Sequence, residues 1–263
     1  MIAKKLYLAL IVFFLYAPIL VLMVFSFNYS RSQAHWAGFS LRWYRELFND
    51  DQIMRAVRNT VLIGIFSTVA ATAIGAAAAV GISKMGRRFK GIVMGVTQLP
   101  VMMPDIVTGI SLRLLFIFVI RFIGAGNLGF GTLLLSHIIF NVPYVILSVM
   151  PKLQQMDGNL YEAALDLGST PFGAFHKVIL PEVWPGVVTG ALLAFTLSVD
   201  DFMVSFFTTG SGVENLSIQI FSMARRGVNP RINALSTLIF IVIMVLLFLV
   251  HKRDQRLARD NSA

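Results

Sequence analysis

Long apolar runs without charged side chains constrain this chain more than any other feature of its sequence. Four such runs cover residues 7–27, 60–82, 132–150 and 234–250. A hydrocarbon layer of about 30 Å is crossed by roughly 20 residues of helix. The runs therefore predict transmembrane helices, which bond their backbone polar groups internally, and they lack the alternation of barrel strands.

Two further stretches, 99–120 and 184–208, are also predicted to span the membrane although they contain ionisable residues, which brings the number of predicted spans to six. Pro100, Pro104 and Asp105 predict that the first of these helices breaks near the prolines and resumes at about residue 106. Interruptions at membrane depth tend to line cavities. We expect an all-α membrane protein with six transmembrane helices, in a single transmembrane domain covering residues 1–263.

The composition excludes several classes of protein. With 57% hydrophobic and only 13% charged residues, the chain is too apolar for an ordinary soluble domain. Its net charge of +9 is therefore assigned to cytoplasmic loops such as Ser83–Lys90, and not to nucleic-acid binding. Cysteine is absent, which excludes disulfides and thiolate chemistry. The apolar run after Lys5 is too long for a cleaved signal, so we expect a retained first helix.

No catalytic constellation is recognised. The nearest match to a phosphate-binding loop, residues 81–86, is followed by Arg87 and Arg88 at a membrane edge and lacks the required lysine and hydroxyl. The histidines are scattered, and we expect His137 to be a hydrogen-bonded packing residue and not a ligand or proton relay. We expect no catalytic residue, no metal site and no cofactor bound by the chain itself.

The loop at residues 151–181 is a polar island between apolar spans. Asn159 and Glu162 have the spacing of a capping box at the start of a short helix, and Gly168 suits the left-handed turn that ends it. The loop therefore begins with one short helix that has a defined start and end.

A second short helix is expected directly afterwards. Ser169 or Thr170 can cap it, Pro171 suits its first turn, and Pro181 is expected to end it. Its apolar residues would share one face: Phe172, Phe175 and Ile179.

The spacing of this loop resembles a known signature. Glu162-Ala163-Ala164 is followed by Gly168 after three residues and by Leu180-Pro181 after a further eleven, which resembles the coupling loop of ABC-importer permeases. Val178 stands where that family usually has isoleucine, and it retains the β-branched apolar character. The resemblance implies a cytoplasmic coupling helix that docks on an ATPase subunit, and it assigns eight coupling residues: Glu162, Ala163, Ala164, Asp166, Leu167, Gly168, Ser169 and Pro181.

Three carboxylates stand at membrane depth. An ionisable group there costs on the order of 3 kcal/mol, so each should face water or a partner. Asp105 has a structural alternative, because it can cap the resumed helix or pair with Arg113. Adjacent Asp200 and Asp201 point about 100° apart on a helix, so one intramembrane cation rarely pairs with both. Carboxylates and aromatic rings suit a cationic solute, although aromatic stripes are more often core. The candidate path residues are Asp105, Asp200, Asp201, Tyr144 and Phe202, with Phe140 and Phe206 as further aromatic candidates.

Three segments, 195–202, 103–112 and 227–235, resemble the spermidine/putrescine branch of these permeases, of the PotC type. The resemblance implies a type I ABC-importer (MetI-like) fold in the bacterial inner membrane, with both termini cytoplasmic. It implies a homologous second permease, two ATPase subunits that bind ATP and Mg²⁺, and an extracytoplasmic binding protein that delivers polyamine.

Other functions remain open at this point. Within the same family, the solute could be an amino-acid derivative, an opine or an iron chelate. A secondary transporter or channel would need no ATPase, and the Glu-Ala-Ala loop argues against it. A membrane enzyme would need a catalytic constellation, which is not found, although the Asp200-Asp201 pair resembles the metal-binding pairs of some lipid transferases.

Overall fold

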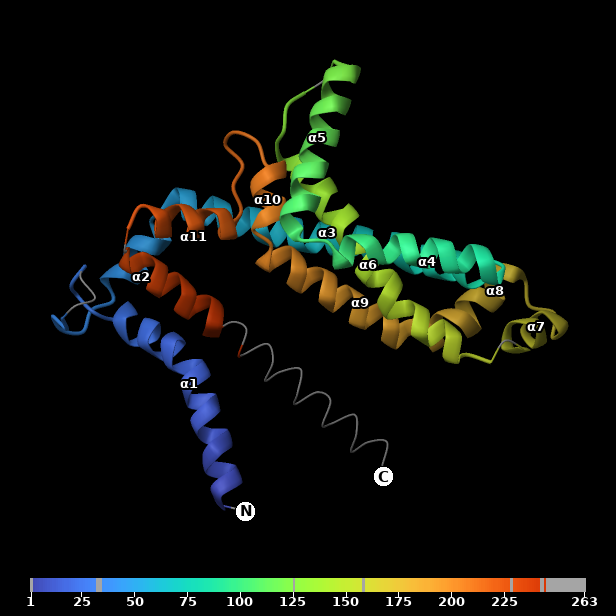
Figure 1. The fold of residues 1–263 in the computed structure, drawn as a ribbon, viewed down its shortest axis with the longest axis horizontal. Coiled ribbons are helices and arrows are strands. Elements are labelled where there is room, and N and C mark those ends of the chain that lie inside the picture. Colours follow the sequence, from blue (N-terminus) through green and yellow to red (C-terminus); the bar gives the residue numbers. More distant parts are fainter. Residues whose placement is uncertain are drawn as a thin grey trace. The chain divides into compact units, whose positions relative to one another are not determined.

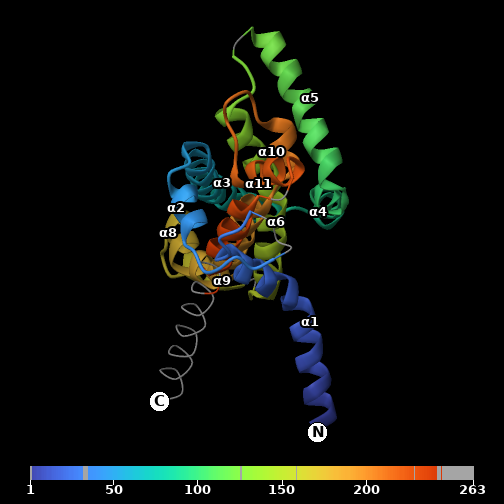
Figure 2. The same ribbon diagram turned by 90° about the vertical axis from the view of Figure 1, so that its left-hand side faces the viewer.

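The computed structural model describes residues 2–31, 35–124, 126–157, 159–227, 229–241 and 244. Helices dominate these ranges, and their β-structure is limited to an isolated bridge between Asn28 and Phe39 (Figures 1 and 2). The chain forms two compact units, Met1–Met54 with Ile220–Ala263, and Arg55–Gln219. The predicted all-α architecture is confirmed.

Five stretches of helix within the described ranges are long and apolar enough to cross a membrane. They are α1 (Ile2–Ser26), α3 (Asp51–Ser83), α5 (Asp105–Ile123), α6 (Phe130–Gln155) and the continuous stretch Pro171–Asp200, which ends in α9 (Leu180–Asp200). The predicted span 234–250 overlaps a shorter apolar helix, Pro230–Ile241, and its remainder lies almost entirely outside the described residues.

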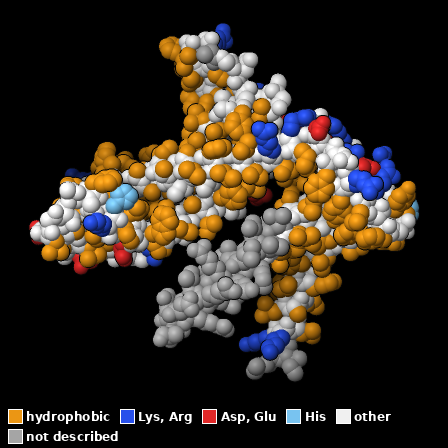
Figure 3. Space-filling view, turned by 180° about the vertical axis from the view of Figure 1, so that it is seen from behind, with side chains coloured by type: hydrophobic (Ala, Val, Ile, Leu, Met, Phe, Trp, Pro, Cys, Tyr) orange, Lys and Arg blue, Asp and Glu red, His pale blue; other side chains and the backbone are white. Residues whose placement is uncertain are grey.

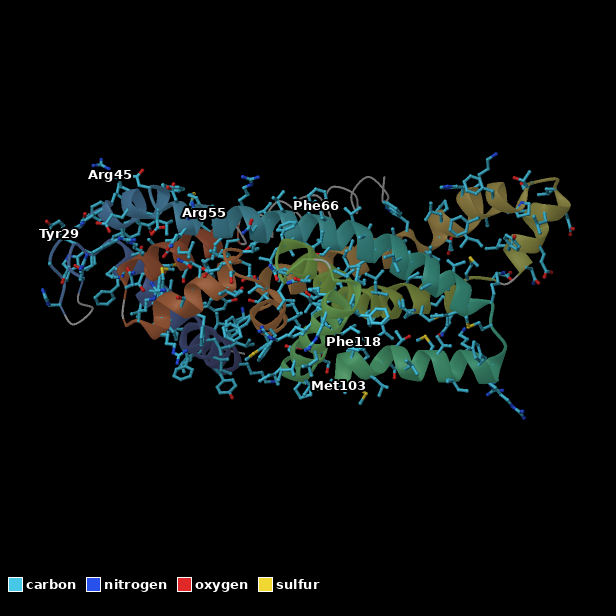
Figure 4. The ribbon with its side chains drawn as sticks, turned by 90° about the horizontal axis from the view of Figure 1, so that it is seen from above. Tyr29, Arg45, Arg55, Phe66, Met103 and Phe118 are labelled. Carbon is cyan, nitrogen blue, oxygen red and sulfur yellow. The ribbon has the colours of Figure 1, made fainter. Side chains whose placement is uncertain are left out.

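The predicted break before the third span is present. Helix α4 (Arg87–Met102) ends just before Met103, and α5 begins at Asp105 (Figure 4). Met103 is extended, with φ −81° and ψ 145°, because the ring of Pro104 disfavours the helical conformation in the preceding residue. Pro100 lies inside α4, so only the second proline separates the two helices.

The predicted span 184–208 is not one helix, and this is a correction. Helix α9 ends at Asp200, the backbone is extended at Asp201 with ψ 129°, and a separate short helix, α10 (Met203–Thr208), follows. The cause is local: the Asp201 carboxylate accepts hydrogen bonds from backbone amides ahead of it in the chain. Helix α11 (Leu216–Arg225) follows after a loop.

The larger unit is built on close helix packing. Helices α6 and α9 run side by side (Figures 1 and 2), and α3 and α9 approach α6 at glycine residues. A Cβ atom added at Gly75 of α3 would lie 2.7 Å from Cβ of Val145, and one at Gly186 of α9 would lie 2.9 Å from the Ser148 carbonyl oxygen. Small residues thus bring the backbones together, as expected for the second span.

In the smaller unit, α2 (Arg42–Phe48) is fixed by ion pairs. Arg231 contacts Glu46 at 3.2 Å and Asp50 at 2.8 Å, and Arg42 contacts Glu46 at 2.7 Å. The hydrogen bond from Arg42 is the main cause that lowers the pKa of Glu46. Helix α1 presents hydrophobic side chains along its length (Figure 3), as a lipid-facing helix would.

Two glycines of α3 give a matched test of this packing. Gly75→Ala should destabilise the purified protein by about 1–3 kcal/mol, because the added methyl overlaps Val145. Gly81→Ala, in the same helix with nothing within 4 Å, should be neutral or stabilise by up to about 1 kcal/mol. Thermal unfolding in detergent measures both, and equal stability of the two variants would contradict the packing.

Candidate functional site

The break between α9 and α10 is the most unusual feature of the larger unit. The Oδ1 atom of Asp201 accepts from the backbone N–H of Val204 at 3.1 Å, and Oδ2 accepts from the N–H of Ser205 at 2.7 Å. The Asp201 side chain is only 5% exposed. A free helix start at membrane depth leaves costly unpaired amides, and this carboxylate supplies the acceptors for two of them.

Side chains from α5 and α6 satisfy the opposite end of α10. Arg113 donates from Nη1 to the carbonyl oxygen of Phe207 at 3.0 Å, and Thr132 donates from its hydroxyl to the carbonyl oxygen of Thr208 at 2.8 Å. Among the described residues Arg113 makes no ion pair with Asp105, so that predicted alternative is wrong. A carboxylate at the start of α10 and a guanidinium at its end complement the helix dipole.

Helix α10 lies directly against α5 (Figures 1 and 2). A Cβ atom at Gly109 of α5 would lie 3.0 Å from the Met203 carbonyl oxygen and 3.3 Å from Cα of Val204. Asp105 is one turn before Gly109 in the same helix. The start of α5 and the start of α10 are therefore close together in this unit.

His137 of α6 lies at the centre of a buried polar network around the break. Its Nδ1 atom is 3.2 Å from the Ser198 hydroxyl of α9, and its Nε2 atom is 2.9 Å from the Ser205 hydroxyl of α10. The ring is 1% exposed, and Nε2 lies 3.7 Å from Oδ2 of Asp201. This agrees with the expected hydrogen-bonded packing role, and it adds contacts to both helices of the break.

Further polar side chains complete the network. Ser198 also accepts from Asn141 Nδ2 at 2.7 Å and lies 2.8 Å from the Ser67 hydroxyl. Asn215 donates to the Ser205 hydroxyl at 2.7 Å. Nearly every helix around the break thus contributes a hydrogen-bonding group to it.

The adjacent carboxylates have different environments. Asp201 is turned inward and bonded, whereas Asp200, the last residue of α9, is exposed. Asp105 is also exposed, and no side-chain capping bond is present at the start of α5. The candidate path carboxylates therefore divide into two exposed groups and one inward group.

The aromatic candidates divide in a similar way. Phe140 is buried in a cluster with Leu112, Phe116 and Val204, so its prediction as a path residue is wrong. Partly buried Tyr144 contacts Phe140 with ring centroids 5.4 Å apart. Phe202 and Phe206 pair at the break with centroids also 5.4 Å apart, and Phe206 is exposed.

The first helix of the polar loop ends where predicted, and its start differs by the capping residue. Helix α7 (Asn159–Asp166) is capped by Asp157, whose Oδ1 atom accepts from the Asn159 N–H at 3.0 Å, and Asn159 is the first helical residue. Gly168 is left-handed with φ 83°. The N–H of Ser169 then bonds to the Ala164 carbonyl at 3.0 Å, which completes a Schellman motif.

The second helix does not stop at Pro181, which is another correction. Helix α8 (Pro171–Ala174), capped by the Thr170 hydroxyl, continues through a π-helical segment, Phe175–Ile179, into α9. The wider π turn accommodates the missing N–H and the bulky ring of Pro181. The loop is thus joined to α9 without a flexible connection.

Leu167 and Phe172 are the most exposed of the large apolar side chains in the loop. Leu167 is 88% exposed and Phe172 is 72% exposed, whereas Ile179 is buried in the core, so the predicted single face of Phe172, Phe175 and Ile179 is wrong. The Lys84 ammonium lies 4.6 Å from the centre of the Tyr161 ring and fixes α7 against the unit. The remaining coupling candidates are exposed or partly so: Glu162, Ala163, Ala164, Asp166, Gly168, Ser169 and Pro181.

Sequence reasoning did not identify Ser198, Ser205 or Arg113 as part of this site. A signal existed, because serines seven residues apart flank the two aspartates in an otherwise apolar stretch. The seven-residue spacing of these serines does not predict which polar side chains of α6 they contact.

Comparison with known proteins places the chain among transporters. The model of the family described as binding-protein-dependent transport system inner membrane component matches residues 71–257. The putrescine transport system permease protein PotI of Escherichia coli K12 is 41% identical over 254 residues, covering 94% of this chain and 90% of the relative. The spermidine/putrescine transport system permease protein PotC of the same strain is 40% identical over 249 residues, covering 95% and 91%.

A solved structure shares the fold. A bacterial alginate ABC transporter, in complex with a periplasmic protein bound to an alginate pentasaccharide, superimposes with a TM-score of 0.72 and 16% identity. The match covers 95% of this chain and 91% of the other. At this identity the likeness shows the fold alone.

Two arginines of α5 give a matched test of the α10 support. Arg113→Leu should destabilise the purified protein by about 1–3 kcal/mol, because the partly buried Phe207 carbonyl loses its charged donor. Arg121→Leu, at the exposed end of the same helix, should change stability by less than about 0.5 kcal/mol. Thermal unfolding compares them, and an unaffected Arg113→Leu protein would contradict the assigned support.

Proposed function

The chain belongs to the family of binding-protein-dependent transport system inner membrane components, and from that premise we propose that it forms the translocation path for polyamines in an ATP-driven importer. The expected resemblance to PotC-type permeases is confirmed by relatives at 40–41% identity over nearly the whole chain. It is therefore a multi-pass permease of the inner membrane and of the MetI-like fold.

The exposed Asp200 at the α9–α10 break is the observation that carries the choice of a polyamine. Polyamines are flexible chains with several ammonium groups, and a carboxylate at membrane depth compensates a positive charge that lipid would exclude. Asp105, which is also exposed, provides a second carboxylate at the start of the neighbouring α5. Phe202, Phe206 and Tyr144 provide aromatic faces for the methylene chain and for cation–π contact.

Asp201 has a different role in this proposal. Its carboxylate already accepts two backbone hydrogen bonds and faces His137, so it supports the break and does not contact the solute. Asp201 thus stabilises the break that shapes the path, and the adjacent Asp200 supplies the negative charge that faces the solute. This division follows from the exposure of Asp200 and the burial of Asp201.

The proposed complex has a second homologous permease, two ATPase subunits and an extracytoplasmic binding protein. The names of the relatives describe them as permease proteins of transport systems, and the fold neighbour was solved with a periplasmic protein. ATP and Mg²⁺ would bind to the ATPase subunits. The 151–181 loop and both termini would lie in the cytoplasm, on the side of the ATPase subunits. The basic Ser83–Lys90 loop would lie there too, because cytoplasmic loops carry an excess of lysine and arginine.

The loop is suited to transmit movement of the ATPase. Exposed Leu167 and Phe172 would fill an apolar groove of that subunit, while the Schellman turn at Gly168 keeps α7 and α8 at a fixed angle. From Pro171 the helix continues to Asp200, and its α9 part of 21 residues is about 31 Å long. A displacement of the loop would therefore reach the break through one helix.

Uptake by the reconstituted complex tests the substrate. Wild type should accumulate spermidine or putrescine in an ATP-dependent way, and Asp200→Asn should lower uptake by about tenfold or more because an ammonium loses its charged partner. Asp51→Asn, exposed at the start of α3, should retain uptake. ATPase activity without uptake of either polyamine would contradict the substrate while leaving the permease family intact.

Disulfide crosslinking tests the coupling role of the loop. The chain lacks cysteine, so single cysteines at positions 163–169 can be paired with single cysteines in the ATPase groove without background. At least one of these positions should crosslink in a complex that still transports. A cysteine replacing exposed Asn49 should not crosslink, and the absence of any crosslink from the loop would contradict docking.

A further inference from the structure

We propose that His137 is a positioning residue for transport, which fixes the angle of the α9–α10 break and thereby the surroundings of Asp200. This inference rests on the proposed function. The imidazole bonds Ser198 before the break and Ser205 after it, at 3.2 and 2.9 Å. Asp200 is the last residue of α9, directly before the extended backbone at Asp201, so its surroundings depend on the angle at which α10 leaves α9.

The burial of His137 makes these contacts hard to replace. The ring is 1% exposed, and water has little access to either nitrogen atom. A buried hydrogen-bonding group that loses its partner is penalised more than an exposed one. A change in the angle between α9 and α10 must therefore lengthen at least one of the two bonds without compensation.

The chemistry of imidazole suits this bridging position. A neutral ring has one N–H donor and one acceptor nitrogen, and a serine hydroxyl can act as either. A glutamine side chain also offers both a donor and an acceptor, whereas leucine offers neither. His137→Gln is accordingly the conservative variant, and His137→Leu is the one that removes the bridge while filling similar space.

The other groups around the break explain why the angle has a defined value. Asp201 caps α10, and Asn215 donates to Ser205, while Ser67 and Asn141 contact Ser198. These contacts bind each serine on its own side of the break. His137 joins the two serines directly, so its removal should loosen the junction while α9 and α10 themselves remain formed.

A cysteine reporter at the path measures how accessible residue 200 is, and it needs no substrate. In the assembled complex carrying Asp200→Cys, a positively charged methanethiosulfonate should label the cysteine, since the natural chain has none. Adding His137→Leu should change the labelling rate by about fivefold or more, the effect expected when buried hydrogen bonds are lost, while His137→Gln should restore it. The exposed His35 supplies the control, and His35→Leu should leave labelling unchanged.

Transport kinetics give the second measurement. In complexes with the native Asp200, His137→Leu should lower the maximal uptake rate by about tenfold, with little change in the KM for the loaded binding protein, because docking occurs elsewhere. His137→Gln should recover most of the rate. Equal labelling and uptake in the His137→Leu and wild-type complexes would overturn the proposal.

Two other outcomes would also overturn it. If both His137 variants fail to assemble into the complex, the residue is needed for folding alone. If His137→Leu lowers uptake while the cysteine at position 200 is labelled at the wild-type rate, the effect does not act through that position. A wild type that transports no polyamine would contradict the proposed function only, since the labelling needs no solute.

Discussion

A helix broken inside a membrane is possible only if its freed backbone groups find partners within the protein. In this chain the requirement is met around α10, a helix of six residues. Asp201 accepts from the amides at its start, and Arg113 and Thr132 donate to the carbonyls at its end. The path carboxylate, the polar network and the packing of α5 all depend on this arrangement.

The break also gives two identical neighbours different tasks. On a continuous helix, Asp200 and Asp201 would differ only by about 100° in direction. The extended backbone at Asp201 separates them further, so that one carboxylate is used internally and the other stays exposed. A polyamine path needs a charge that is not already neutralised, and the buried network leaves Asp200 available for it. At its other end α9 is continuous with the coupling loop, which connects the ATPase side to the same carboxylate.

The sequence predicted those features that local chemistry decides. Apolar run lengths identified the membrane helices, Pro104 marked the break before α5, and Gly168 marked the end of α7. It failed where a local hydrogen bond or turn, or a contact with a distant segment, overrides the apolar or proline pattern. The stretch 184–208 is apolar enough to be one helix. Its division into α9 and α10 is visible only in the hydrogen bonds that the backbone amides after Asp201 donate to the Asp201 carboxylate. Pro181 was expected to end a helix, but a π turn preserves the continuity, and Arg113 was paired with the wrong group because its acceptor is 94 residues away.

The proposed path requires that α9 and α10 are separate helices whose junction exposes Asp200 and buries Asp201. A scan with single cysteines at positions 199–203 of the assembled complex tests it most directly, because the natural chain contains no cysteine. A charged, water-soluble thiol reagent should label position 200 rapidly, and position 201 should be protected. Rapid labelling at position 201 with protection at position 200 would contradict it, as would equal labelling of the two.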